Sequence, residues 1–179
     1  TEYQFTINAI PGASGHALSP FYSYIPGYIQ HSTETNTVKR GSTDYVTTSE
    51  STVSPNNFQQ IYSKVTTHNG DIQETTTKYA QDISDTRLIT ANIISVPLET
   101  VVKDNGNILS TSKTLFGNSS HFYPTSVMIT DLAQNPETQM TFDVYDDQGN
   151  LVQITNKAGI STTTIWGYHK TLPIAEIAG

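Results

Sequence analysis

Short runs of apolar and β-branched residues alternate with turn residues from Phe21 to Gly179, at a spacing of roughly ten residues. Within the runs, apolar and polar side chains tend to alternate, which is the period-two pattern of a half-buried strand. Regular turns between such runs are typical of antiparallel hairpins. We therefore predict an all-β fold, an antiparallel hairpin meander with no helix of convincing length.

Three turn sequences mark the clearest predicted hairpins: His68-Asn69-Gly70-Asp71, Asp104-Asn105-Gly106-Asn107 and Asp146-Asp147-Gln148-Gly149-Asn150. The strand pairs predicted around them are 61–67 with 72–79, 96–103 with 108–116, and 140–145 with 151–155. Asn-Gly suits a type I′ turn, in which both central residues need a positive φ. The three segments share one plan, and a single hairpin cannot bury a core, so we expect the hairpins to stack on their neighbours.

Alternation also assigns faces near the C-terminus. Before the third turn, one face is predicted to hold Met140, Phe142 and Val144, and the other Thr141, Asp143 and Tyr145. A later strand is predicted to place Ile160, Thr162, Thr164, Trp166 and Tyr168 on one side. Residues 79–89 have room for one helical turn, with Ser84 as a cap, but 85–90 are better interpreted as the entry to a strand.

The first twenty residues mix small side chains with Gly and Pro. We interpret 1–20 as an irregular N-terminal segment with one short strand at 3–10, and 21–179 as the β-sheet region. An aromatic run over 21–29 contains Pro26-Gly27, which predicts a turn or bend.

Composition supports the strand prediction. The chain has 28 Thr, 17 Ser, 17 Ile and 10 Val but only 8 Leu. Branched side chains of this kind pack well on a pleated, half-buried surface. A mostly helical protein is therefore not favoured.

Charge and length narrow the functional classes. Nine Lys and Arg against 16 Asp and Glu give a net charge of −7, without a basic cluster to neutralise a phosphate backbone, so nucleic-acid binding is not expected. The sequence contains no run of eighteen apolar residues, so no membrane-spanning helix is predicted. The absence of cysteine excludes disulfides and thiol chemistry but fits both a reducing and an oxidising compartment. The chain starts at Thr1 without an initiator methionine, from which we expect it to be a piece of a longer protein.

No residue pattern indicates catalysis, a cofactor or a metal. The five histidines lie far apart in sequence and share no ligand spacing (His16, His31, His68, His121 and His169). Asp143, Asp146 and Asp147 lack the spacing and the bidentate Glu of a calcium loop. Glycosidase chemistry by distant carboxylates stays open, although the acids that we considered belong to polar strand edges or loops (Glu74, Glu99, Asp131 and Glu137). No Gly-x-Ser-x-Gly elbow is present.

Aromatic residues offer a binding alternative. Trp166 with Tyr168, and the group Phe21, Tyr22, Tyr24 and Tyr28, would serve as a platform for sugar or protein if they were exposed. Packing between hairpins is the favoured alternative for both groups.

The segment Tyr145-Asp146-Asp147-Gln148-Gly149-Asn150-Leu151 resembles the YD repeat of the RHS family, whose pattern is Tyr-Asp, two variable residues, Gly, Arg or Asn, then Leu. The Trp166-Gly167-Tyr168 strand and the Pro173–Ile177 strand that follows it resemble RHS proteins of the Bacteroidetes type, as do 94–99 and 108–114. The resemblance is good over 88–179 and weaker over 21–86, where the repeats diverge.

This resemblance implies an architecture. RHS repeats are hairpins joined side by side into a strip that spirals into a hollow shell, which encloses a toxin domain in some members. Tyr145, Asp146, Gly149, Asn150, Leu151, Trp166, Gly167 and Tyr168 would then be structural repeat residues. Gly149 would take a positive φ, Asp146 and Asn150 would bond the turn backbone, and Tyr145 would pack on the next hairpin. The plug with an Asp-Pro cleavage motif is absent, so we expect a fragment of such a shell.

From these features we predict a non-enzymatic structural segment of a large RHS-repeat protein, secreted or displayed on a bacterial surface. Its main partner would be the remainder of the parent chain. Two alternatives stay open: a surface binding or adhesin-like module that uses aromatic residues, and an export client held by a bacterial secretion translocon or other outer-membrane components.

Overall fold

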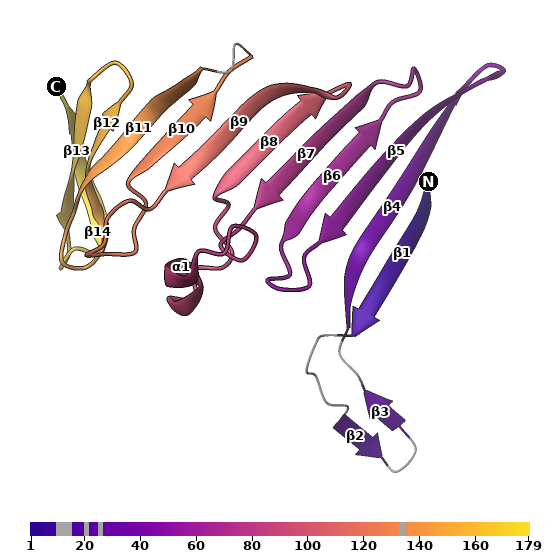
Figure 1. Ribbon diagram of the computed structural model, residues 1–179, viewed down its shortest axis with the longest axis horizontal. Helices are drawn as coiled ribbons and strands as arrows, with labels where there is room; N and C mark the ends of the chain where they lie inside the picture. Colours follow the sequence, from indigo (N-terminus) through magenta and orange to yellow (C-terminus); the bar gives the residue numbers. More distant parts are fainter. Residues whose placement is uncertain (10–15, 20–21, 25–26, 133–134) are drawn as a thin grey trace.

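The structure, a computed structural model, describes residues 1–9, 16–19, 22–24, 27–132 and 135–179. Twelve antiparallel strands form one sheet in the order β1-β4-β5-β6-β7-β8-β9-β10-β11-β12-β13-β14, and β2 pairs with β3 in a separate two-stranded sheet (Figure 1). From β4 onward each strand pairs with the next one in the chain. The predicted all-β antiparallel meander is confirmed.

The elements are β1 (Glu2–Ala9), β2 (His16–Ser19), β3 (Tyr22–Tyr24), β4 (Gly27–Arg40), β5 (Thr43–Val53), β6 (Gln60–Thr66), β7 (Ile72–Lys78), α1 (Thr86–Thr90), β8 (Glu99–Asp104), β9 (Asn107–Leu115), β10 (Ser126–Thr130), β11 (Pro136–Tyr145), β12 (Leu151–Asn156), β13 (Ser161–Gly167) and β14 (Leu172–Ala178). The strand expected at 3–10 is β1, an edge strand of the main sheet, so the N-terminal segment is not simply irregular. Residues 25–26, with the Pro of the predicted Pro-Gly turn, lie outside the described residues.

The sheet is a single layer, and between β4 and β8 each of its two faces carries a polar row. One face carries a row of opposite charges in which Glu50 lies opposite Lys64, Lys64 opposite Glu74, and Glu74 opposite Lys103. The other carries a row of hydroxyls in which Ser32, Ser51 and Ser63 are successive neighbours, with the Ser32 and Ser51 oxygens 2.8 Å apart. We call these the charged face and the hydroxyl face. Cross-strand pairs of both kinds stabilise neighbouring strands.

The accessible surface shows how little a second layer contributes. It measures 11,676 Å², whereas a compact monomer of 19.6 kDa exposes about 8,600 Å². Most strand residues are half-buried or exposed, since each face has only neighbouring side chains to cover it. Lateral pairing, and not a buried core, therefore holds most of this sheet together.

The predicted turns reverse the chain, but their geometry differs from one to the next. Asn105 and Gly106 both have a positive φ, 47° and 83°, as a type I′ turn requires. In the His68–Gly70 turn, only Gly70 has a positive φ, of 88°. That connection has more than two residues, and a single left-handed Gly at its end closes it.

Two sequence-based expectations were wrong. Residues 86–90 form α1 and not the entry to a strand, since Asp85 accepts a hydrogen bond from the Leu88 amide and caps the helix. β8 begins at Glu99, three residues later than expected, because 79–98 fold into a loop around α1.

Bulges change the face assignment near the C-terminus. The β11–β12 register shifts after Phe142, so Phe142 lies opposite Ile154 while Val144 lies opposite Gln153. Because Gln153 and Ile154 are adjacent and point to opposite faces, Val144 leaves the face of Phe142. Ile160 and Tyr168 lie in turns outside β13.

Antiparallel order sends alternate connections to opposite ends of the sheet (Figure 1). One end, which we call the turn end, holds the short connections 41–42, 67–71, 105–106 and 157–160. The other, the loop end, holds the connections 54–59, 79–98, 116–125, 146–150 and 168–171.

Candidate functional site

Every buried residue among those whose burial the structure describes lies in a connection at the loop end. The apolar ones are Tyr79, Ala80, Leu88 and Leu98, and the polar ones are Ser54 and Asn57. Asn57 donates to the carbonyl of Ile94 at 3.2 Å, and the Tyr79 hydroxyl donates to that of Gln60 at 3.1 Å. These contacts join the 54–59 and 79–98 connections into one packed unit.

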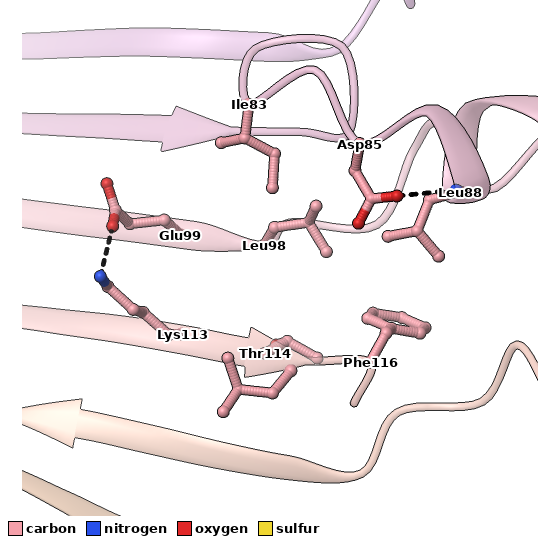
Figure 2. A pocket seen from close by; sticks show the side chains of 9 residues that line it. Ile83, Asp85, Leu88, Leu98, Glu99, Lys113, Thr114 and Phe116 are labelled. Atoms are coloured by element: carbon pink, nitrogen blue, oxygen red, sulfur yellow. Dashed lines mark hydrogen bonds and ion pairs between the residues drawn. The ribbon is translucent and has the colours of Figure 1, made fainter. Parts of the chain in front are cut away.

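An open pocket of about 280 Å³ lies between α1 and the loop-end parts of β8 and β9. Its lining residues are Ile83, Asp85, Leu88, Leu98, Glu99, Lys113, Thr114, Leu115 and Phe116. Figure 2 shows Leu88, Leu98 and Phe116 near one another, with the Glu99–Lys113 ion pair at the opposite side. Leu88 and Leu98 are buried and Phe116 packs against them, so the floor of the pocket is apolar.

The charged rim of this pocket is compensated. Glu99 accepts hydrogen bonds from Lys78 at 2.6 Å and pairs with Lys113 at 2.9 Å. The bond from Lys78, followed by that from Lys113, lowers the pKa of Glu99 below its ordinary value. A carboxylate held in this way stays ionised and is a poor general acid. The pocket can accept an apolar group, and the Glu99 and Lys113 side chains in its lining are paired with each other.

Arg87 connects α1 to the 116–125 connection. Its guanidinium donates to the carbonyls of Phe116, Asn118 and His121, the last two at 2.8 and 3.3 Å. The same group lies 5.3 Å from the ring centre of Phe122, within cation–π range. A planar guanidinium can hold several carbonyls at once, which an ammonium group cannot do with the same geometry. Nothing in the sequence indicated this role for Arg87.

Tyr145 connects the same loop to the next turn. Its hydroxyl donates to the carbonyl of Pro124 at 2.8 Å, and its ring stacks on Tyr123 with 4.7 Å between ring centres. Burial, with a smaller contribution from Tyr123, raises the pKa of Tyr145 above its ordinary value. Tyr145 thus contacts the preceding connection, whereas the resemblance implied packing on the next hairpin. No pattern in the sequence indicated Tyr123 as its partner.

The turn at 146–150 is held by its own side chains. Asp146 accepts from the amides of Gln148 and Asn150, both at 2.9 Å. Desolvation opposes ionisation here, but the bonds from Asn150 and Gln148 outweigh it and lower the pKa of Asp146. Gly149 has a φ of 83°, and a Cβ there would lie 2.6 Å from Cζ of Tyr123. This position therefore requires glycine for its conformation and for its close contact.

The last loop-end turn contains three consecutive residues in the left-handed region, Tyr168, His169 and Lys170, with φ of 50°, 58° and 63°. Left-handed backbone is unfavourable for residues with a Cβ. The turn is held from outside, since Asn150 donates to the Lys170 carbonyl at 2.8 Å and Asp147 pairs with the Lys170 ammonium. The bond from Lys170 lowers the pKa of Asp147.

The remaining repeat residues lie next to this turn. Trp166 is half-buried and donates its indole N–H to the carbonyl of Leu151 at 2.9 Å. Gly167 lies under Ile174, whose Cγ2 would be 2.7 Å from a Cβ at that position. Tyr168 is 72% exposed, so Trp166 and Tyr168 do not form one exposed platform. The side chains of Phe21, Tyr22 and Tyr24 lie outside the described residues, while Tyr28 packs edge-on against Phe58.

Other candidate residues do not gather into a site. Within the described part of the chain, no group of three His, Asp or Glu side chains could hold a metal ion. Glu74 accepts from the Tyr62 hydroxyl at 2.7 Å, which is the main reason that the pKa of Tyr62 rises to about 12. Glu137 pairs with Lys157 at 3.4 Å. Among the described elements, no helix has the length and apolar character needed to cross a membrane.

No protein-family model matches this chain, and no curated protein matches it either. The resemblance to YD repeats therefore rests on the residues that carry it.

Proposed function

We propose that this chain is a non-enzymatic structural segment, a stretch of β-sheet wall in a large secreted or surface-displayed protein of the RHS type. The single observation that carries the proposal is the twelve-stranded single layer, which has about 3,000 Å² more accessible surface than a compact monomer of its mass. A sheet that leaves both faces open provides area and stiffness in place of an enclosed site.

The loop end supports this proposal. Its contacts run from one connection to the next: Asn57 reaches Ile94, Arg87 reaches the 116–125 loop, Tyr145 reaches Pro124, and Asn150 reaches Lys170. Such contacts brace neighbouring hairpins against one another along the width of the sheet. The YD-like residues Tyr145, Asp146, Gly149 and Asn150 belong to this bracing, which fits a structural role.

Small-angle X-ray scattering tests the proposal. Twelve strands about 4.8 Å apart make a sheet about 50 Å wide, and a compact chain of 179 residues has a radius of gyration of about 16 Å. At low protein concentration we expect a clearly larger radius and the distance distribution of a flat particle. A radius of 16 Å with a globular distribution would contradict the wall.

A second candidate function, a surface binding module, is favoured by the Tyr168–Lys170 turn alone. It presents an exposed aromatic ring on a backbone conformation that the rest of the loop end must hold in place. A printed glycan array probed with the wild-type chain and the Tyr168→Ala variant tests it. Lost glycan signals with unchanged thermal stability would support binding, and an array without signals would remove this candidate.

A further inference from the structure

One charged side chain in the pocket between α1, β8 and β9 is not neutralised by its neighbours. Glu99 uses both of its carboxylate oxygens, one with Lys78 at 2.6 Å and the other with Lys113 at 2.9 Å. Asp85 accepts a hydrogen bond from the Leu88 amide through one oxygen, at 3.0 Å. Within the described part of the chain, its second oxygen has no hydrogen-bond partner and its charge has no ion-pair partner. The pocket therefore contains one carboxylate oxygen that is free to bind a ligand.

The Asp85 carboxylate lies beside apolar surface. Figure 2 shows the Asp85 side chain directed toward Leu98 and Phe116, with the Glu99–Lys113 pair farther along the pocket. Leu98 is buried, Phe116 packs against it, and Asp85 itself is half-buried. Because water covers a carboxylate in such a position only in part, a cation placed against it is attracted more strongly than at an open surface.

The walls of the pocket are held in place by backbone hydrogen bonds. The Asp85 amide donates to the Ala80 carbonyl at 2.9 Å, and the Thr114 amide donates to the Leu98 carbonyl at 3.0 Å. Ala80 is fully buried, so the loop that carries Asp85 is anchored in the packed unit. Binding sites for small molecules are usually preformed in this way, because ordering a loop on binding costs affinity.

We propose that this pocket binds a small organic cation, in which a primary ammonium group is attached to an aromatic or branched aliphatic body. The ammonium group donates to the free oxygen of Asp85, and the body packs on Leu98 and Phe116. Two carboxylates and one ammonium group line the pocket, so its charge favours a cation over an anion. The volume of about 280 Å³ suits a body of one ring or a few methyl groups. This inference concerns the packed loop end and does not depend on the proposed wall.

Titration of the whole chain with phenethylamine at pH 7, followed through amide chemical shifts, tests the proposal directly. We expect saturable shifts at Leu88, Leu98 and Phe116 with a dissociation constant of about 1 mM, as for a ligand of about ten non-hydrogen atoms. Phenethyl alcohol has the same body without the charge, and phenylacetate reverses the charge, so both should bind more weakly by about fivefold or more. Equal affinity for the alcohol, tighter binding of phenylacetate, or no shifts at these residues up to about 20 mM amine would overturn the proposal.

Asp85→Asn tests the carboxylate without removing the helix cap, because Asn caps helices as well as Asp does. We expect the affinity for phenethylamine to fall to that for phenethyl alcohol, while the affinity for the alcohol and the midpoint of urea unfolding stay unchanged. Asp82→Asn is the matched control, because Asp82 lies in the same connection, does not line the pocket and accepts from the Tyr79 amide, which Asn can also do. Wild-type affinity in Asp85→Asn, or an equal loss in Asp82→Asn, would refute the proposal. Asp85→Ser, which also caps, serves if the Asn variant does not fold.

The apolar half of the site has a separate test. Methylamine carries the charge without the body, and it should cause no saturable shift in the same range of concentration. Ile83→Ser removes an apolar side chain that lines the pocket and is 49% exposed, so the fold should tolerate the change. This variant should weaken the binding of phenethylamine and of phenethyl alcohol alike, by about threefold. If methylamine bound as tightly as phenethylamine, or if Ile83→Ser left both affinities unchanged, the proposed contact with an apolar body would be wrong.

Discussion

At the turn end, connections of two to five residues reverse the chain and none of their described residues is buried. At the loop end, the 79–98 connection alone has twenty residues and holds four of the six buried residues that the structure describes. The same strands run between the two ends, so the difference in burial between the ends comes from the connections. Neighbouring strands therefore pair along the whole sheet, whereas buried side chains pack together only at the loop end. Variants of one residue type placed at each end can break or sharpen that contrast.

The largest effect is expected from the packed loop. Leu88 is the buried residue of α1, with 1% of its surface exposed, and Leu88→Ala should lower the free energy of unfolding by about 2–4 kcal/mol through lost burial and a residual cavity. Leu109→Ala is the control, because Leu109 lies in β9 toward the turn end and is 37% exposed. Leu109→Ala should lower the free energy of unfolding, measured by urea denaturation, by less than about 1 kcal/mol. Equal losses would mean that the two ends do not differ in packing.

Two glycines with the same backbone conformation give the next contrast. Gly149 and Gly70 have φ of 83° and 88°, but a Cβ would overlap Tyr123 at the first and meet nothing within 4 Å at the second. Gly70→Ala should therefore cost only the left-handed strain of about 1 kcal/mol. Gly149→Ala should cost about 2–3 kcal/mol, because Tyr123 must also move. Chemical denaturation measures both losses of unfolding free energy. If Gly149→Ala lost no more than Gly70→Ala, the close contact between Gly149 and Tyr123 would be contradicted.

Two arginines separate bracing from surface contact. Arg87 donates to three carbonyls at the loop end, while Arg40 at the turn end lies over the Tyr45 ring at 5.6 Å. Arg87→Met should destabilise by about 1–2 kcal/mol and speed amide hydrogen exchange in 116–125. Arg40→Met should change the free energy of unfolding by no more than about 0.5 kcal/mol and should leave amide hydrogen exchange in 116–125 unchanged. Unchanged protection of 116–125 in Arg87→Met would show that the loop holds itself.

The smallest contrast concerns pH. Because the bonds from Lys78 and Lys113 lower the folded-state pKa of Glu99, its stabilisation is present above the unfolded-state value and lost as pH falls through the folded-state value. Glu99→Gln should thus be less stable than wild type at pH 7, by less than about 1 kcal/mol, and this difference should shrink as the pH falls below the ordinary glutamate pKa of about 4.3. Asp44→Asn, which removes an exposed 3.9 Å pair with Lys39, is the control and should show no measurable gap. A Glu99 gap that stays constant with pH would contradict the ion-pair explanation.

The hairpins themselves were predictable because their signals are local. Asn105-Gly106 and Gly149 take positive φ for reasons contained in a few residues, and alternation sets the strands on either side. The turn role of Asp146 and Asn150 follows from the same short stretch. Residues 85–90 were misjudged, since a five-residue helix is too short to show a period and depends on its cap and on packing against Leu98.

By itself the sequence determined the strand class, the meander order and the position of the main reversals, since hydrogen bonds between adjacent hairpins need only alternation and turn chemistry. Only the tertiary structure decided which connections became packed, that Arg87 and Tyr123 take part, and that Val144 changes faces after a bulge. Those outcomes depend on contacts between residues some twenty to thirty positions apart and on register shifts in a partner strand. Neither quantity is encoded in any short window of the chain.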